Sequence, residues 1–359
     1  MHLGVDAASM AIDRRGLGRY TRQVLRHLAA LRPGLRVTLY AESAAERAAL
    51  AEELPALGYP GALGAATPVR VLQGDPPEIV WFPRGRITFV PPTGKRVVTI
   101  HDLAPFHVEH RSWLVGLTWW RRRRRIRATA ARADLILTDS QYSRTDILTR
   151  LAVPPGKVAV VPLAADDFGP ATEVPDRDAL ATRFGITAPF ILYVGAGDRR
   201  KNLSGLREAF RNLRARGGPP VQLVLCGPRV PSRAAQPGVV WVGRVTDAEL
   251  RLLYHAAMAF VLPSFLEGFG LTVLEAMASG TPVLCSNATS LPEVAGDAAL
   301  YFDPLNLGAL TDLMARCLTD AALRADLVER GRAQAGRFSW AETARATLAL
   351  FDAVRGSPP

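Results

Sequence analysis

Two acidic residues eight positions apart, with glycines beside the first, are the strongest chemical signal in the sequence. The stretch from Pro263 to Val283, PSFLEGFGLTVLEAMASGTPV, contains Glu267, Gly268, Gly270 and Glu275. Glycines let a backbone approach a ligand closely, and the first N–H groups of a helix have no partner within it. A glycine loop before a helix can therefore hold a diphosphate, and a nearby carboxylate can accept hydrogen bonds from sugar hydroxyls. The alternative is a surface loop with ordinary helix glutamates.

A basic turn forms the second signal. The stretch from Tyr193 to Asn202, YVGAGDRRKN, contains Arg199, Arg200 and Lys201 directly before a predicted helix. Three cations at the end of a strand can neutralise a departing diphosphate without a metal ion. The alternative is a solvated basic turn.

The first third of the chain contains two weaker signals. Residues 13–20, DRRGLGRY, follow the first predicted strand directly and include Gly16 and Gly18, which predict a ligand-facing loop. His101 comes at the end of a predicted strand over residues 96–100, followed by Asp102. Such a histidine can donate a hydrogen bond to a sugar hydroxyl or transfer a proton, although a structural histidine is the alternative.

Residues 111–132, RSWLVGLTWWRRRRRIRATAAR, contain eight arginines, three tryptophans and no acid. Val115, Trp119, Ile126 and Ala130 share one face of the predicted helix. Tryptophan beside arginine is typical of a helix that lies on an anionic membrane. The alternative is a packed domain helix whose basic side is solvated.

Short apolar runs alternate with helix-like segments along the whole chain. Most runs are continuous rather than alternating, which favours parallel strands buried on both faces. The pattern predicts doubly wound α/β sheets in two Rossmann-like domains, joined by a linker over residues 163–178. Two such domains facing each other would form a cleft at the carboxyl ends of their strands. The predicted strands are residues 2–6, 36–40, 78–82, 96–100, 135–139 and 158–161, then 190–194, 221–226, 239–242, 259–262, 282–285 and 299–302.

The composition limits the classes of protein to which the chain can belong. The chain has 359 residues, of which 48% are hydrophobic and 21% charged, as in a soluble two-domain protein. Its three cysteines are widely spaced and lack a Cys-x-x-Cys pair, which argues against disulfides or zinc and fits the reducing cytoplasm. We expect neither a membrane span nor a signal peptide. The net charge of +11 attracts phosphate groups.

These segments, in this order, resemble glycosyltransferase family 4, a retaining group with the GT-B fold. The resemblance covers most of the chain and includes GLGRYTRQVLRHL, TIHDLAPF, LILTDSQYSRTDI, ILYVGAGDRRKN and FLEGFGLTVLEAMASG. It implies an α/β fold of two facing Rossmann-like domains with an interdomain cleft and a C-terminal crossover helix. Residues 1–165 would form the acceptor domain and residues 166–339 the nucleotide-sugar donor domain, with a helix over 340–359 crossing back to the first.

The resemblance also implies a role for each matching position. Glu267 would contact the donor sugar, and the backbone of Gly268, Phe269, Gly270 and Leu271 would hold the sugar and diphosphate. By the same resemblance, Glu275 would bind the ribose hydroxyls, and Arg200 and Lys201 would bind the diphosphate. Val245 would contact the base and His101 the sugar. Gly16 and Gly18 would face the phosphates.

The family transfers sugar from a nucleotide donor with retention of anomeric configuration, and it lacks an agreed carboxylate nucleophile. The favoured account is a front-face reaction in which the departing phosphate helps to deprotonate the acceptor. The HDL and GxGRY segments look most like the mannosyltransferase branch, so GDP-mannose is the first expectation for the co-substrate, with no other cofactor and no metal. A UDP- or dTDP-sugar is the alternative.

The chain departs from this branch in two places. Arg199 stands where the branch often has proline, and HVEHRSW follows the His-Asp segment where acceptors bind. The acceptor is therefore left open among a glycan, a lipid-linked molecule and a small molecule.

Two hypotheses of another class also remain, a basic nucleic-acid-binding protein and a catalytically inactive protein that binds a sugar nucleotide. No nucleic-acid motif is recognisable, so we expect no nucleic-acid partner. We expect a cytoplasmic protein, with a peripheral site at the inner face of an anionic membrane through Trp119, Trp120, Arg121, Arg122, Arg123, Arg124 and Arg125.

Overall fold

The computed structural model describes residues 1–12, 16–41, 43–59, 76–89, 91, 93–107, 113–169, 177–217, 220–228 and 236–356. Parts of three predicted segments lie outside these residues: 13–15 of the first glycine loop, 111–112 of the basic helix and 170–176 of the linker. The chain forms two compact units. Unit 1 is Met1–Leu163 with Trp340–Pro359, and unit 2 is Ala164–Ser339. The boundary lies two residues before the predicted one.

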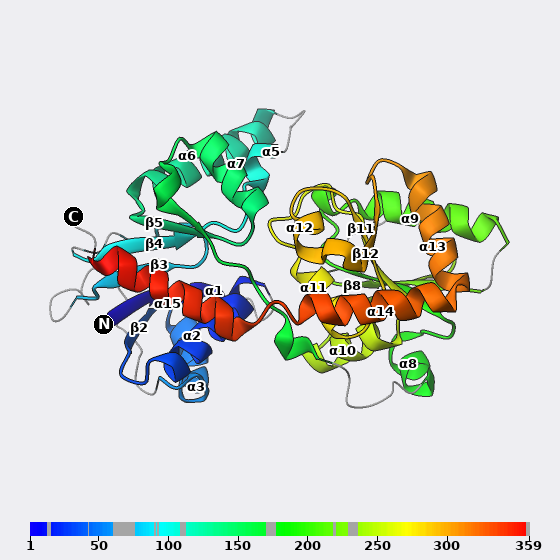
Figure 1. Cartoon of the computed structure of the whole chain (residues 1–359), viewed down its shortest axis with the longest axis horizontal. Coiled ribbons are helices and arrows are strands. Elements are labelled where there is room, and N and C mark those ends of the chain that lie inside the picture. Colours follow the sequence, from blue (N-terminus) through cyan, green and yellow to red (C-terminus); the bar gives the residue numbers. More distant parts are fainter. Residues whose placement is uncertain are drawn as a thin grey trace. The chain divides into compact units, whose positions relative to one another are not determined.

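Unit 1 contains a six-stranded parallel sheet with the order β2-β1-β3-β4-β5-β6 (Figure 1). The strands are continuous apolar runs buried on both faces, as parallel strands covered by helices must be. Each lies within one residue of its predicted bounds. They are β1 (His2–Asp6), β2 (Arg36–Tyr40), β3 (Ile79–Phe82), β4 (Lys95–Thr99), β5 (Leu135–Thr138) and β6 (Val158–Val160).

The last helix of the chain packs in unit 1. In Figure 1 α15 (Trp340–Gly356, red) lies along α2 (Leu17–Leu31), and Arg32 forms two hydrogen bonds to Asp352, of 2.9 and 2.6 Å. Trp340 and Phe351 of α15 are fully buried. The other α-helices among the described residues of unit 1 are α1 (Ala8–Ile12), α3 (Ala44–Glu53), α5 (Ala104–His107), α6 (Trp113–Arg132) and α7 (Gln141–Leu151).

Unit 2 contains a second parallel sheet of six strands, with the order β12-β11-β10-β7-β8-β9. Its strands are β7 (Phe190–Val194), β8 (Gln222–Cys226), β9 (Val239–Gly243), β10 (Ala259–Leu262), β11 (Val283–Ser286) and β12 (Ala299–Phe302). Its α-helices are α8 (Arg177–Phe184), α9 (Leu203–Ala215), α10 (Asp247–Ala256), α11 (Leu271–Ala278), α12 (Leu291–Ala295), α13 (Leu307–Thr319) and α14 (Ala321–Ala335). The strands again match their predicted bounds to within one residue.

The strand order of unit 2 reverses beside β7. From β7 the chain builds outward through β8 and β9, then returns to the other side of β7 as β10. In open α/β sheets, ligands bind outside the carboxyl ends of the strands at such a reversal. The loops that leave β7 and β10 are those in which the sequence predicts the basic turn and the first acid.

Two further observations concern the whole set of described residues. None of the helices within them is long and apolar enough to cross a bilayer. Cys226, Cys285 and Cys317 are all buried and carry free thiols.

Candidate active site

A backbone hydrogen bond joins the two predicted loops of unit 2. Arg199–Lys201 form a 3-10 turn after β7, and the carboxylate of Asp198 caps it by accepting from the backbone N–H of Arg200 at 3.1 Å. The backbone N–H of Phe265, in the loop after β10, donates to the carbonyl of Arg200 at 2.7 Å. The basic turn and the acidic loop therefore meet at the strand-order reversal.

Lys201 and Glu267 form a nearly buried ion pair. The Lys201 Nζ lies 2.6 Å from Glu267 Oε1, and the side chains are 12% and 8% exposed. The Ser264 hydroxyl donates to the same oxygen at 2.6 Å, and the Glu267 backbone N–H donates to the Thr289 hydroxyl at 3.0 Å. Each charge compensates the desolvation of the other. Glu267 Oε2 has no hydrogen bond within the described part of the chain, which leaves it able to accept one.

The glycine loop leads into α11 through a conformation that only glycine adopts readily. Gly270 has φ of +107°, and a Cβ atom there would lie 2.7 Å from the Leu291 side chain. The Ser290 hydroxyl donates to the carbonyls of Glu267 and Phe269 at 3.0 and 2.9 Å, which ties this loop to the start of α12. No side chain caps α11, so the N–H groups of its first turn can face an anion.

Glu275 lies within α11 and is nearly buried, with 6% of its surface exposed. The Tyr254 hydroxyl, from α10, donates to Glu275 Oε2 at 3.0 Å. This contact holds the carboxylate at a defined place on the helix that follows the glycine loop. Val245, also largely buried, precedes α10 and comes from the end of β9, an edge strand two positions from β7.

In unit 1, His101 is paired with a buried carboxylate. Its Nδ1 lies 2.6 Å from Asp139 Oδ2 and its Nε2 lies 3.0 Å from the carbonyl oxygen of Pro83. His101 follows β4 and Asp139 follows the neighbouring strand β5. Since a carboxylate and a carbonyl both accept, the ring donates from both nitrogens, as an imidazolium does.

The pKa of His101 responds to opposing influences. Burial is the largest and lowers the pKa, because it disfavours the charged ring. The charge and hydrogen bond of Asp139, the Pro83 carbonyl and the charge of Asp102 together outweigh burial and raise the pKa above its usual range. His101 is therefore better suited to act as a cationic hydrogen-bond donor than as a base.

The helix that contains the first glycine motif contributes to the surroundings of His101. The Tyr20 ring of α2 packs edge-on against the His101 ring at 5.1 Å, and the hydroxyls of Tyr20 and Thr99 share a hydrogen bond of 3.2 Å. Gly16 is exposed at the N-cap of α2, whereas Gly18 is buried in its first turn. The prediction that the glycine loop follows β1 directly is wrong, because α1 intervenes.

Sequence reasoning missed several residues that hold the predicted ones. Asp139, Ser264 and Thr289 come shortly after β5, β10 and β11, so their place at the carboxyl ends of predicted strands could have indicated them. Tyr254 lies inside α10 and has no such signal, because only the packing of α10 beside α11 brings it to Glu275.

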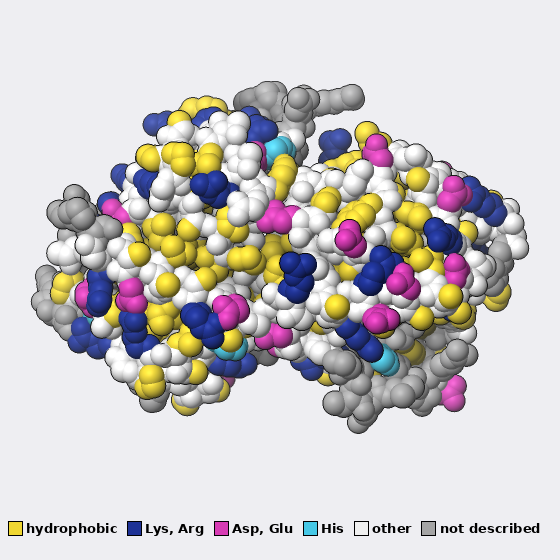
Figure 2. Space-filling view, viewed as in Figure 1, with side chains coloured by type: hydrophobic (Ala, Val, Ile, Leu, Met, Phe, Trp, Pro, Cys, Tyr) yellow, Lys and Arg dark blue, Asp and Glu magenta, His cyan; other side chains and the backbone are white. Residues whose placement is uncertain are grey.

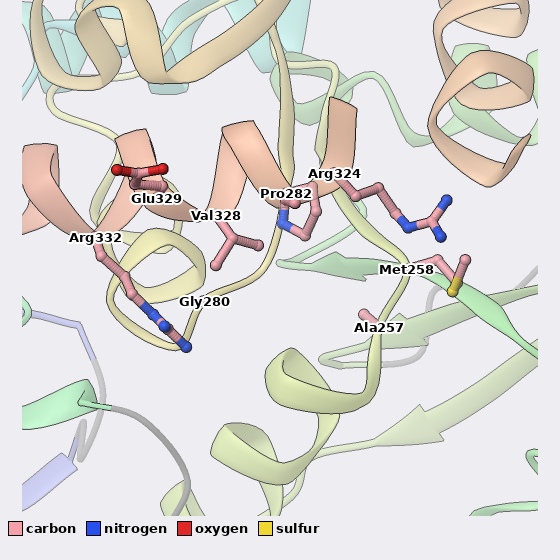
Figure 3. Close-up of a pocket in the computed structure, with 9 residues that line it drawn as sticks. Ala257, Met258, Gly280, Pro282, Arg324, Val328, Glu329 and Arg332 are labelled. Atoms are coloured by element: carbon pink, nitrogen blue, oxygen red, sulfur yellow. The ribbon is translucent and has the colours of Figure 1, made fainter. Parts of the chain in front are cut away.

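A separate cavity lies at the opposite end of the unit 2 sheet (Figure 3). It has a volume of about 530 Å³, and its lining includes Met258 and Pro282, which directly precede β10 and β11. The basic residues Arg324 and Arg332 of α14 also line it. The cavity is thus at the amino ends of the strands, whereas Lys201 and Glu267 are at the carboxyl ends.

Two family models together match most of the chain. The model described as Glycosyltransferase Family 4 matches residues 14–167, and the model described as Glycosyl transferases group 1 matches residues 177–334. These matches correspond closely to the two units.

Two curated relatives are a mannosyltransferase and a maltose-1-phosphate synthase by name. The chain is 36% identical to O-antigen chain mannosyltransferase B of Escherichia coli over 61% of this chain and 60% of that one. It is 31% identical to alpha-maltose-1-phosphate synthase of Mycolicibacterium smegmatis, over 72% of this chain and 73% of that one. The chain therefore spans less than two thirds of the first relative.

Solved structures support the fold. HepE of Anabaena, in complex with UDP-glucose, matches with a TM-score of 0.75 and 17% identity, covering 98% of this chain and 99% of that one. Sucrose-phosphate synthase of Thermosynechococcus elongatus matches with a TM-score of 0.72 and 22% identity, covering 98% of each chain. Together with the two parallel sheets, these likenesses identify the fold as GT-B.

Proposed function

Since the chain belongs to glycosyltransferase family 4, we propose that it transfers a hexose from a nucleotide-sugar donor to an acceptor, with retention and without a metal ion. Unit 2 would bind the donor and unit 1 the acceptor. The observation that carries the proposal is the nearly buried Lys201–Glu267 pair at the strand-order reversal of unit 2. A cation and an acid held together at this end of the sheet suit a ligand that carries both phosphate groups and hydroxyls.

The diphosphate is assigned to Arg200 and Lys201 of the basic turn and to the start of α11. Lys201 uses one N–H group on Glu267, and two remain for phosphate oxygens. Arg200 and the backbone from Gly268 to Leu271 add further donors. Positive charge at this position stabilises the negative charge that develops on the leaving diphosphate, which lowers the barrier.

The transfer itself is a front-face displacement. The bond between the anomeric carbon and the diphosphate oxygen breaks, and the acceptor oxygen bonds to that carbon on the same face. The acceptor proton passes to the departing phosphate oxygen, so no protein base is needed at that step. Glu267 Oε2 would accept from a sugar hydroxyl, and Glu275 would accept from the ribose hydroxyls.

Unit 1 would contribute a cationic donor. We assign to His101 a hydrogen bond to a sugar hydroxyl, which its Nε2–H makes in place of the bond to the Pro83 carbonyl. Asp139 keeps the ring oriented and protonated. Gly16 and Gly18 are assigned to the phosphates of the donor, and Val245 is assigned to its base.

The donor we propose first is GDP-mannose. The name of the E. coli relative supports mannose as the sugar. The UDP-glucose complex of HepE supports a UDP-sugar as the alternative. The acceptor proposed is a glycan or a lipid-linked glycan, consistent with the O-antigen chain in the name of the first relative.

The test is a donor screen followed by a transfer assay. Thermal stabilisation by GDP, UDP and dTDP, with a chelator present, should identify the base, because a ligand that binds only the native state raises the melting temperature. Release of nucleotide from the matching sugar donor would support the proposal, provided that NMR shows the same anomeric configuration in the product as in the donor. Binding without transfer to any acceptor would favour an inactive sugar-nucleotide binder. Tight binding of duplex DNA at physiological salt, without nucleotide binding, would favour the nucleic-acid hypothesis.

We also propose that the protein works in the cytoplasm. The three buried free thiols suit a reducing compartment. Fractionation of cells that express the full chain tests this, since recovery from an oxidising compartment would contradict it.

A further inference from the structure

Helix α6 exposes apolar side chains on its outer face. Its inward face holds Trp119, Ile126 and Ala130, as the periodicity predicts, and these are half-buried or buried. On the opposite side, Leu117 is 42% exposed and Trp120 is 53% exposed. These two residues lie one turn apart, so they form a continuous apolar patch on the surface. Packing within unit 1 does not account for them.

The arginines of α6 fall into two groups. Arg123 and Arg127 are tied to α5, because both guanidinium groups lie over the Phe106 ring, at 5.8 and 5.1 Å, and Arg123 donates to the Pro105 carbonyl at 2.6 Å. These two side chains anchor the helix, so they have a structural role.

The second group points to solvent. Arg121, Arg122, Arg124 and Arg125 are exposed, and no carboxylate among the described residues lies within ion-pair distance of them. The Arg124 guanidinium stacks over the exposed Trp120 ring at 5.6 Å. Some exposed arginines of unit 2 are paired, as Arg211 is with Glu208 and Arg216 with Asp312. The positive charge of α6 is therefore uncompensated within the described chain.

The patch and the charges share one face. Leu117, Trp120, Arg121 and Arg124 are separated by three, four and seven positions, which places them together on a helix. Figure 2 shows hydrophobic and basic side chains interleaved over the upper part of unit 1, where α6 lies. An exposed tryptophan and leucine between basic residues suit an interface that is anionic at its surface and apolar just beneath. A nucleic acid would satisfy the charge but not the leucine.

We propose that Leu117, Trp120, Arg121 and Arg124 form a docking face for an anionic lipid bilayer. The two apolar side chains enter the boundary between headgroups and acyl chains, and the arginines bind lipid phosphates. Docking of this kind is independent of glycosyl transfer, and it would bring unit 1 to acceptors held in a membrane.

The experiment measures co-sedimentation of the full-length protein with two kinds of vesicle. Phosphatidylglycerol–phosphatidylcholine vesicles should bind the protein at low salt, and pure phosphatidylcholine vesicles should not. Two variants separate the parts of the face. Arg121→Gln with Arg124→Gln should lower the partition coefficient by ~10-fold or more, and Leu117→Ser with Trp120→Ser should lower it and remove the blue shift of tryptophan fluorescence.

A matched variant controls for net charge. Arg211→Gln with Arg216→Gln removes the same charge from exposed positions of unit 2 and should bind vesicles like the unchanged protein. All variants should keep the wild-type melting temperature and the wild-type nucleotide release from a soluble donor, because none touches the proposed active site. Equal binding to both vesicles, an equal loss in the control, or duplex DNA that displaces the protein from vesicles would overturn the proposal.

Discussion

Each unit places an acid beside a cation at the carboxyl ends of two neighbouring strands, yet the two pairs are built differently. Lys201 and Glu267 in unit 2, and His101 and Asp139 in unit 1, are both separated by 2.6 Å. An ammonium group stays charged at any physiological pH, whereas an imidazolium can lose its proton close to neutrality. Unit 2 therefore holds a fixed charge, and unit 1 holds one whose presence depends on pH.

The two carboxylates also differ in how far each depends on its cationic partner. The paired oxygen of Glu267 accepts a second hydrogen bond from Ser264, so it does not rely on Lys201 alone. Asp139 is buried, and its Oδ1 has no hydrogen-bond partner among the described residues. A buried acceptor without a donor is costly, so Asp139 depends strongly on the proton that His101 supplies. The comparison teaches that a similar ion-pair distance can serve a permanent charge or a titratable one.

The largest effect is expected from removing the fixed charge. Lys201→Ala should lower turnover of the nucleotide-sugar donor by ~100-fold or more, because the leaving diphosphate loses a stabilising cation. The chain should still fold, with a lower melting temperature, because Glu267 loses its cation but keeps the hydrogen bond from Ser264. Circular dichroism and steady-state kinetics check both statements. Arg199→Ala is the matched control, because Arg199 is adjacent but exposed, and near-normal turnover of Lys201→Ala would refute the assigned role.

The second effect concerns the titratable pair. Asp139→Asn should lower the pKa of His101, because it removes the negative charge that raises this pKa against the effect of burial. Proton and nitrogen NMR of the His101 ring as a function of pH measures the change directly. Turnover should fall by ~10-fold at neutral pH and recover in part at lower pH, where the ring is again protonated. An unchanged titration of His101 would contradict the pairing.

The same pair predicts how stability depends on pH. The pKa of His101 is raised in the folded state, so its contribution to the free energy of unfolding is fully present below the unfolded-state pKa of about 6.5. That contribution is lost as the pH rises through the folded-state pKa. Urea unfolding at a series of pH values should show this loss in the unchanged protein and a smaller one in Asp139→Asn. Identical pH profiles for the two proteins would exclude the linkage.

A smaller effect is expected when only the extra hydrogen bond of unit 2 is removed. Ser264→Ala deletes one donor to Glu267 Oε1 but leaves the Lys201 pair in place. The free energy of unfolding should fall by about 1 kcal/mol, and turnover by a few-fold, since one hydrogen bond is lost without loss of charge. Chemical denaturation and donor kinetics test this. A loss of turnover as large as that of Lys201→Ala would mean that Ser264 has a direct role.

The smallest effect is expected at a histidine–carboxylate pair outside the proposed site, in which the histidine is 22% and the aspartate 10% exposed. His107 Nε2 lies 2.7 Å from Asp146, which also pairs with Arg150 at 2.5 Å. Asp146→Asn should lower the free energy of unfolding by about 1 kcal/mol, because the amide oxygen can still accept a hydrogen bond, and it should leave turnover unchanged, because the pair lies outside the proposed site. Thermal unfolding and donor kinetics provide the test, and a large fall in turnover would show that this pair also serves the reaction.

The strands and their loops could be predicted from the sequence because the signal is local. Continuous apolar runs such as Phe190–Val194 and Ala259–Leu262 are typical of parallel strands buried on both faces, and their bounds were predicted correctly. The glycine at position 270 and the basic turn before α9 were likewise visible as residue types. What could not be predicted is α1, a short helix that lies between two features whose patterns are stronger.

By itself, the sequence determined which residues stand at the ends of strands, because chain order places them there whatever the strand order is. The tertiary structure alone decided which of these meet. Lys201 and Glu267 are 66 positions apart, and His101 and Asp139 are 38 apart, so each contact depends on which strands are neighbours in the sheet. Packing also decided which arginines of α6 anchor the helix and which remain in solvent. The physical reason is that strand order and helix packing minimise the free energy of the whole core. No short segment of sequence determines that free energy by itself.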